Sequence, residues 1–286
     1  MKTKSAAVAW AGLIAAISVF ICACASSEVG PSTYEQDGVD IEATAGVPEN
    51  PDITDPADDP ISEVDVPAAP VPEKTTQFDD PDSYIIYDSS TDTYYLTEEE
   101  EQIGKESLFV GDSICLGFST WSVVPDRNVY ATGNVGARNL FEYEMYYLSE
   151  RAEFTDVLNE VKPKHIFLWM GMNDVNLTSA KDYCENYRTI IDTALQNTSA
   201  DVYICAITPI CRLDFTGPMR IREFNEAIER FIKKNYTERV HFINFGEPLK
   251  NADGILDEQY NGGDGIHLAR KAYYVAMHEI NRQMIH

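Results

Sequence analysis

Positive charge is scarce in this 286-residue sequence: 22 Lys and Arg stand against 47 Asp and Glu, and the net charge is −25. Between positions 26 and 104 there are 22 acidic residues and a single basic one, Lys74, so residues 105–286 carry a net charge of only −6. Binding to nucleic-acid phosphates requires clustered Lys and Arg, and the sequence holds no such patch. We therefore exclude nucleic acid as a partner.

Metal-binding spacings are also lacking. The five His and six Cys form no cluster with the short spacings typical of metal ligands, so we expect no metal site. Four of the cysteines, Cys115, Cys184, Cys205 and Cys211, fall in the C-terminal two thirds of the chain. We expect at most one disulfide among them, with Cys211 as the candidate partner.

Charge is absent from a long run at the N-terminus. Lys2 and Lys4 precede the uncharged residues 6–25, a pattern typical of an export signal. The run is longer than the apolar part of most signals, so an uncleaved transmembrane anchor is the alternative. The segment Ile21-Cys22-Ala23-Cys24 resembles a bacterial lipoprotein processing site, in which Cys24 would become the lipid-modified first residue. Either interpretation predicts that residues 1–25 lead to export and membrane tethering on the extracellular side.

Residues 26–104 are acidic, and residues 26–103 contain nine of the 14 prolines. Such a segment cannot bury enough apolar surface to offset its ordering entropy, so we expect a disordered stem. Two aromatic patches, Tyr84–Tyr87 and Tyr94–Leu96, are the exception. They are expected to dock on the folded domain as a short hairpin.

Residues 105–286 are expected to form one folded domain, in which short apolar runs alternate with helical periods. A helix is expected directly after Ser113. The other expected elements are strands at Leu108–Gly111, Asn128–Thr132, His165–Met170, Val202–Ile207 and Val240–Asn244, and helices at Ala137–Leu148, Ala152–Val161, Ala180–Gln196, Met219–Asn235 and Leu268–Met284. This alternation indicates an α/β fold with an open parallel sheet covered on both faces.

In such sheets ligands bind beyond the carboxyl ends of the strands. Ser113 directly follows the first strand, at the start of a helix where backbone N–H groups are unpaired. It is a candidate nucleophile, although serine is also a common helix cap. His267 lies in a glycine-rich loop after the last strand and is the candidate base, with Asp264 placed to orient its imidazole.

Acyl transfer also requires hydrogen-bond donors for the oxyanion. The candidates are the backbone N–H groups of Ser113 and Gly136 and the side-chain amide of Asn173. Taken alone, Gly136 is better explained as a plain turn glycine, and Asn173 as part of a loop that closes a strand. Arg138 is interpreted as a surface charge at a helix start, with contact to an anionic or hydroxyl-rich substrate as the alternative.

Together these segments resemble the SGNH (GDSL-type) hydrolase family over residues 106–286. The four blocks are Gly111-Asp112-Ser113, Gly136, Gly171-Met172-Asn173-Asp174 and Asp264-Gly265-Ile266-His267. The resemblance implies a flavodoxin-like three-layer α/β/α sandwich with a central five-stranded parallel sheet, a Ser113–His267–Asp264 triad, a three-donor oxyanion hole and no cofactor. Ile114-Cys115-Leu116 departs from the small polar residues usual in the family, and the Gly-x-Ser-x-Gly elbow of lipases is absent.

From these observations we expect a monomeric cell-surface serine esterase that removes small acyl groups, such as acetyl, from carbohydrate or wall glycan. A lipase-like or lysophospholipase activity and an acyltransferase with the same triad are the enzymatic alternatives. A non-catalytic surface binding module is the alternative of another class, and the complete set of candidate residues argues against it.

Overall fold

The computed structural model describes residues 80–284, and the expected signal with Cys24 and most of the expected stem lie outside this range. A five-stranded sheet forms the centre, in the order β4-β3-β7-β8-β9, and all its neighbours are parallel. Its strands are β3 (Ser107–Gly111), β4 (Val129–Ala131), β7 (His165–Trp169), β8 (Asp201–Cys205) and β9 (Val240–Ile243). The expected α/β fold is confirmed.

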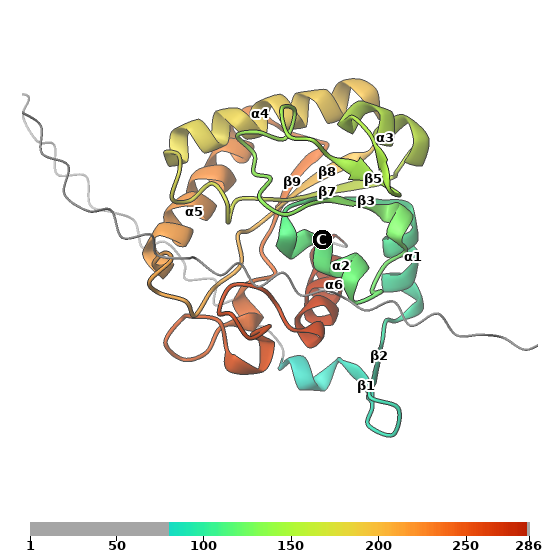
Figure 1. The fold of residues 1–286 in the computed structure, drawn as a ribbon, viewed down its shortest axis with the longest axis vertical. Helices are drawn as coiled ribbons and strands as arrows, with labels where there is room; N and C mark the ends of the chain where they lie inside the picture. The colour runs from blue at the N-terminus through green and yellow to red at the C-terminus, as the bar shows by residue number, and fades with distance from the viewer. Residues whose placement is uncertain (1–79, 285–286) are drawn as a thin grey trace, which may run out of the picture. The chain divides into compact units, whose positions relative to one another are not determined.

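Helices cover both faces of this sheet (Figure 1). On one face lie α1 (Glu98–Glu106), α2 (Ser113–Thr120) and α6 (Arg270–Met284), and on the other α3 (Phe154–Val161), α4 (Ala180–Asn197) and α5 (Pro218–Asn235). Short 3-10 helices occur at Pro81–Ser83, Asp126–Asn128, Glu247–Leu249 and Glu258–Tyr260. Four of the expected helices, α3 to α6, are found with ends within two residues of the prediction. Within residues 80–284, no helix has the length and apolar character needed to cross a membrane.

Buried aromatic rings hold the sheet to its helices. Phe109 of β3 stacks on Phe167 of β7 at 4.9 Å between ring centroids, and Phe118 of α2 packs edge-on against Trp169 at 5.4 Å. All four side chains are at most 2 % exposed. The core therefore lies directly beneath the loops that follow β3 and β7.

The expectation of a stem extending to residue 104 is wrong at its C-terminal end. The short antiparallel hairpin of β1 (Ile86–Asp88) and β2 (Thr93–Tyr95) was expected and is confirmed, and α1 follows it. Tyr84 stacks on His278 of α6 at 3.6 Å. Thr97 and Glu100 form a capping box at the start of α1, and the four glutamates of its first turn lie at the end of the helix dipole that favours negative charge. The folded domain thus includes residues 80–104.

The helix expected over residues 137–148 is also wrong. Residues 136–143 form consecutive turns, and a two-residue strand β5 (Tyr146–Tyr147) pairs with β6 (Glu150–Arg151). Leu148 and Ser149 have φ values of 48° and 73°, which a continuing helix cannot contain. Tyr147 is buried while Tyr146 is half exposed, so this end of the segment alternates as a strand does.

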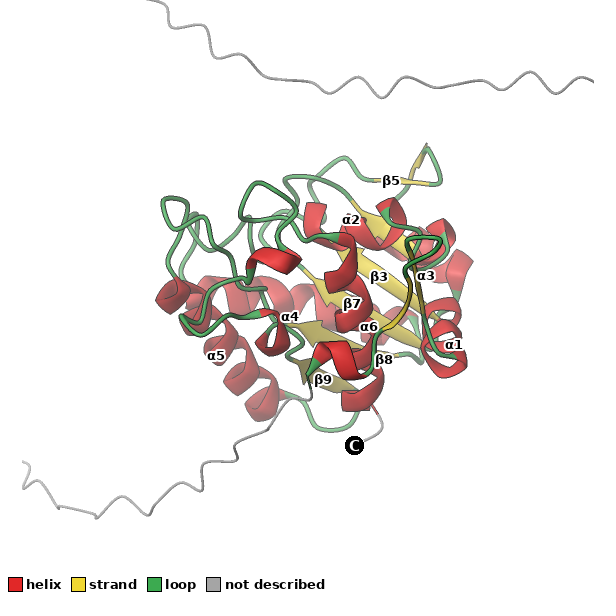
Figure 2. Cartoon of the chain, turned by 90° about the horizontal axis from the view of Figure 1, so that it is seen from below, coloured by secondary structure: helices red, strands yellow, loops and turns green. Residues whose placement is uncertain are grey.

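The strand order places a topological switch point beside β3. The chain passes from β3 to β4 on one side and later reaches β7 on the other. Loops gather at one end of the sheet (Figure 2). In doubly wound sheets the crevice at a switch point is where ligands bind, and here it lies between the segments that follow β3 and β7.

Candidate active site

Ser113, Asp264 and His267, which come from two distant segments of the sequence, meet beyond the carboxyl ends of the strands. Nε2 of His267 lies 2.8 Å from Oγ of Ser113, and Nδ1 of His267 lies 2.6 Å from Oδ2 of Asp264. A hydroxyl bonded to an imidazole that is itself bonded to a carboxylate is an arrangement suited to nucleophilic catalysis. The structure therefore brings the three expected residues together.

Ser113 is fixed by the transition from β3 to α2. Oδ1 of the preceding Asp112 accepts the N–H of Ile114 at 2.9 Å and caps the helix. Ser113 is the first residue of α2, so its own N–H has no acceptor within the helix. Burial raises the pKa of Asp112 to about 7, although the N–H groups of Ile114 and Cys115 oppose the rise. A carboxyl that titrates near neutrality thus adjoins the serine.

The loop that carries His267 is organised by its own polar side chains. Oδ1 of Asp264 accepts the N–H groups of Ile266 and His267 at 2.9 and 2.8 Å. Partial burial raises the pKa of Asp264, but the hydrogen bonds from His267 and Ile266 outweigh it and lower the pKa to about 2. Asp264 is therefore ionised at neutral pH and can stabilise a protonated His267.

Asp174 ties the segment after β4 to the segment after β7. Its fully buried carboxylate accepts the N–H of Ala137 at 2.9 Å and that of Arg138 at 3.1 Å. A Cβ at Gly136 would lie 2.5 Å from Oδ2 of Asp174, so this approach requires glycine. The sequence did not indicate this role for Asp174, because its partners lie 36 and 37 residues away.

Arg138 does not behave as the surface charge that was expected. Its guanidinium Nη1 donates to the carbonyl oxygen of Asn173 at 2.7 Å and lies 3.5 Å from Oδ1 of Asp174. The side chain is only 29 % exposed. Arg138 therefore joins the two segments that carry Gly136 and Asn173.

The two remaining candidate donors lie in adjacent segments, and both already have acceptors. The N–H of Gly136 donates to Oδ1 of Asn139 at 2.8 Å, and Nδ2 of Asn173 donates to the carbonyl oxygen of Val135 at 2.9 Å. Sequence reasoning did not single out Asn139.

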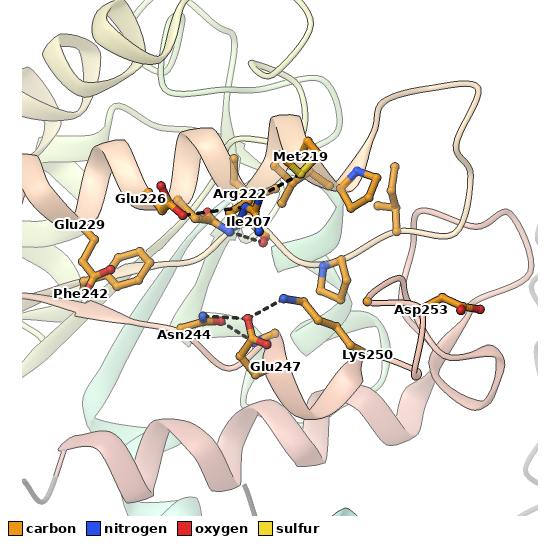
Figure 3. Close-up of a pocket in the computed structure, with 17 residues that line it drawn as sticks. Ile207, Met219, Arg222, Glu226, Glu229, Phe242, Asn244, Glu247, Lys250 and Asp253 are labelled. Carbon is orange, nitrogen blue, oxygen red and sulfur yellow. Dashed lines mark hydrogen bonds and ion pairs between the residues drawn. The ribbon is translucent and has the colours of Figure 1, made fainter. Parts of the chain in front are cut away.

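A cavity of about 460 Å³ lies away from these residues, between α5 and residues 244–254 (Figure 3). Its cations have acidic neighbours: Lys250 lies 2.5 Å from Glu247, and Arg222 lies 3.9 Å from Glu226. The cavity is lined by none of the candidate catalytic residues, and we assign it no part in the chemistry.

The cysteines of the described domain are all free thiols, so the one disulfide allowed from the sequence is not formed there. Among residues 80–284, no group of three or more His, Cys, Asp or Glu side chains is arranged to hold a metal ion.

A family model described as GDSL-like Lipase/Acylhydrolase matches residues 109–275. Among solved structures, a Streptococcus pneumonia protein assigned as a platelet activating factor has a TM-score of 0.50 at 18 % identity, covering 66 % of this chain and 94 % of its own. A Bacteroides fragilis protein assigned as an acylhydrolase has a TM-score of 0.50 at 17 % identity, covering 63 % and 86 %. No curated protein gives a significant match.

Proposed function

The chain belongs to the GDSL-like lipase/acylhydrolase family, and we propose that it is a serine esterase whose catalytic residues are Ser113, His267 and Asp264. Family membership supports acyl-ester hydrolysis. The observation that carries the residue assignment is the pair of contacts made by the His267 ring, 2.8 Å to Ser113 and 2.6 Å to Asp264.

In the proposed reaction, Oγ of Ser113 attacks the ester carbonyl carbon while Nε2 of His267 takes the hydroxyl proton. The tetrahedral intermediate collapses with cleavage of the bond to the leaving oxygen, and His267 returns the proton to the departing alcohol. Water then attacks the acyl-enzyme, again with His267 as base, and releases the carboxylic acid. Asp264, ionised at neutral pH, stabilises the imidazolium in both halves.

The oxyanion of each intermediate is proposed to be held by the N–H of Ser113, the N–H of Gly136 and the side-chain amide of Asn173. The free N–H at the start of α2 supports the first of these. The buried Asp174 and its neighbour Arg138 support the other two, since they fix both segments relative to each other.

We further propose that the substrate is a small acyl ester, such as an acetyl group, on carbohydrate or wall glycan. The N-terminal sequence supports this location of action: a pattern typical of an export signal, Cys24 in a lipoprotein-like setting, and a long acidic Pro-rich segment before the domain. A tether of this kind would place the esterase outside the cell, held to the membrane by a lipid or a helix.

Hydrolysis of nitrophenyl esters of increasing acyl length, by the full chain and by Ser113→Ala, tests both the small-acyl substrate and the catalytic role of Ser113. We expect turnover of the acetate, much slower turnover of the octanoate, and none above background with Ser113→Ala. A preference for octanoate would contradict the small-acyl assignment and favour the lipase-like alternative. Undiminished hydrolysis by Ser113→Ala would contradict the catalytic assignment itself.

A further inference from the structure

One peptide unit at the site, between Val135 and Gly136, is held by an asparagine side chain on each side. Its carbonyl oxygen accepts from Nδ2 of Asn173 at 2.9 Å, and its N–H donates to Oδ1 of Asn139 at 2.8 Å. The described chain contains only trans peptide bonds, in which the C=O and N–H point in opposite directions. The N–H of Gly136 therefore points away from Asn173.

This orientation prevents two of the proposed donors from meeting on one oxygen atom. With standard peptide dimensions, an acceptor bonded to the N–H of Gly136 would lie about 4.5 Å or more from Nδ2 of Asn173. Hydrogen bonds of this kind extend to about 3.2 Å. In the conformation observed, the oxyanion hole is therefore incomplete.

We propose that the Val135–Gly136 peptide is a switch, and that Asn139 is a positioning residue that holds it in the resting orientation. Rotation of this single peptide turns the N–H of Gly136 toward Asn173. The same rotation withdraws the carbonyl oxygen of Val135 and frees the N–H of Asn173 Nδ2 that was bonded to it. One local movement thus supplies two donors, and the inference rests on the proposed esterase function.

The conformational freedom of Gly136 allows this rotation, and the hydrogen bonds to Asp174 limit it to the Val135–Gly136 peptide. Gly136 has no Cβ, so positive and negative φ values are about equally accessible to it. The next two N–H groups, those of Ala137 and Arg138, are bound by the buried Asp174 and keep the following turn in place. The negative charge that develops on the substrate favours the rotated state, because a charged acceptor binds an N–H about twice as strongly as the neutral amide of Asn139.

A purely structural role for Asn139 makes different predictions. Its backbone N–H also donates to the carbonyl oxygen of Gly136 at 3.2 Å, so the side chain completes a turn similar to a capping box. If capping were its only role, aspartate would replace it without loss and alanine would be harmful. If Asn139 holds the switch, the aspartate variant should be slower than wild type and the alanine variant faster.

Steady-state hydrolysis of nitrophenyl acetate at pH 8 distinguishes the two roles. Asn139→Asp introduces a stronger acceptor and is expected to lower kcat about tenfold with little change in Tm. Asn139→Ala removes the acceptor and is expected to raise kcat about fivefold. Asn134→Asp adds the same charge at an exposed position of the same loop and serves as the control. An aspartate variant equal to wild type, with a slower alanine variant, would overturn the switch.

A crystal structure after reaction with diethyl p-nitrophenyl phosphate tests the movement directly. This reagent transfers its diethylphosphoryl group to the serine oxygen and releases nitrophenol, leaving a tetrahedral adduct. We expect the N–H of Gly136 within hydrogen-bond distance of the phosphoryl oxygen and no longer on Asn139. An adduct on Ser113 with the peptide unmoved would overturn the switch alone. Absence of any adduct on Ser113 would overturn the proposed function as well.

Discussion

Tyr273 of α6 donates its phenolic hydroxyl to the carbonyl oxygen of Ile114 in α2 at 2.8 Å. Its ring lies against Gly117, where an added Cβ would be 1.9 Å from the hydroxyl oxygen and 2.1 Å from the ring. The contact joins the helix that begins with Ser113 to the helix that begins three residues after His267. This packing of α6 on α2 thus helps to fix the position of Ser113 relative to His267.

Gly117→Ala is therefore expected to destabilise the domain. Tyr273 is only 2 % exposed and has no room to withdraw. Overpacking of this kind costs about 1–3 kcal/mol, or about 2–12 °C in Tm for a domain of this size. Thermal unfolding provides the measurement, and Gly133→Ala is the matched control because its Cβ would meet no atom within 4 Å. Equal melting temperatures for the two variants would contradict the packing assigned to Tyr273.

Asp112 makes stability depend on pH. Its pKa rises from 3.8 to about 7 on folding because the carboxyl is buried. Between these values the folded state binds more protons than the unfolded state, so folding becomes less favourable as the pH rises. The amide introduced by Asp112→Asn would be neutral throughout, and its oxygen could still accept the N–H of Ile114.

The Tm of Asp112→Asn minus that of wild type is expected to be larger at pH 8 than at pH 5. Differential scanning calorimetry at both pH values measures this change. A Tm difference that stays constant or shrinks as the pH rises would show that Asp112 is already ionised in the folded protein at pH 5.

Asn173→Ala tests the proposed oxyanion donor. Loss of one such donor lowers kcat by about 10²–10³, whereas KM should change little because the interaction strengthens only in the transition state. Asn197→Ala, at the exposed end of α4, removes a hydrogen bond to the carbonyl oxygen of Thr193 and is the control. If both variants hydrolyse nitrophenyl acetate equally well, Asn173 is not a donor.

The contacts made by residues 80–104 predict how truncation affects stability. A chain that begins at residue 80 keeps these contacts and is the reference for the comparison. A chain that begins at residue 105 loses the stack of Tyr84 on His278 and most of α1, which packs on α6. Its Tm should fall by several degrees, and identical unfolding curves would instead support a boundary at residue 105.

Much of the sheet could be predicted from the sequence because its strands are buried on both faces and read as unbroken apolar runs. Ser113 directly follows the end of β3, and His267 lies in the glycine-rich loop between β9 and α6, so their meeting at the carboxyl ends of the strands was also predictable. The helix α1 was missed because four consecutive glutamates resemble a solvated stem. Its capping box at Thr97 and Glu100 was the available signal.

The contacts that position Gly136 were beyond the reach of sequence patterns. Asp174 binds N–H groups that lie 36 and 37 residues away. Residues 137–148 are predicted as a helix, yet they form consecutive turns up to residue 143 and then the β5–β6 hairpin, whose turn residues Leu148 and Ser149 adopt left-handed conformations. Both features depend on tertiary contacts rather than on local preference.

Covalent labelling of the full chain by diethyl p-nitrophenyl phosphate tests the central claim most directly. Intact mass and peptide mapping should show a single diethylphosphoryl group on Ser113, and His267→Ala should abolish its formation. Labelling at another residue, or undiminished labelling of the His267→Ala variant, would contradict the assignment of Ser113 and His267 as nucleophile and base.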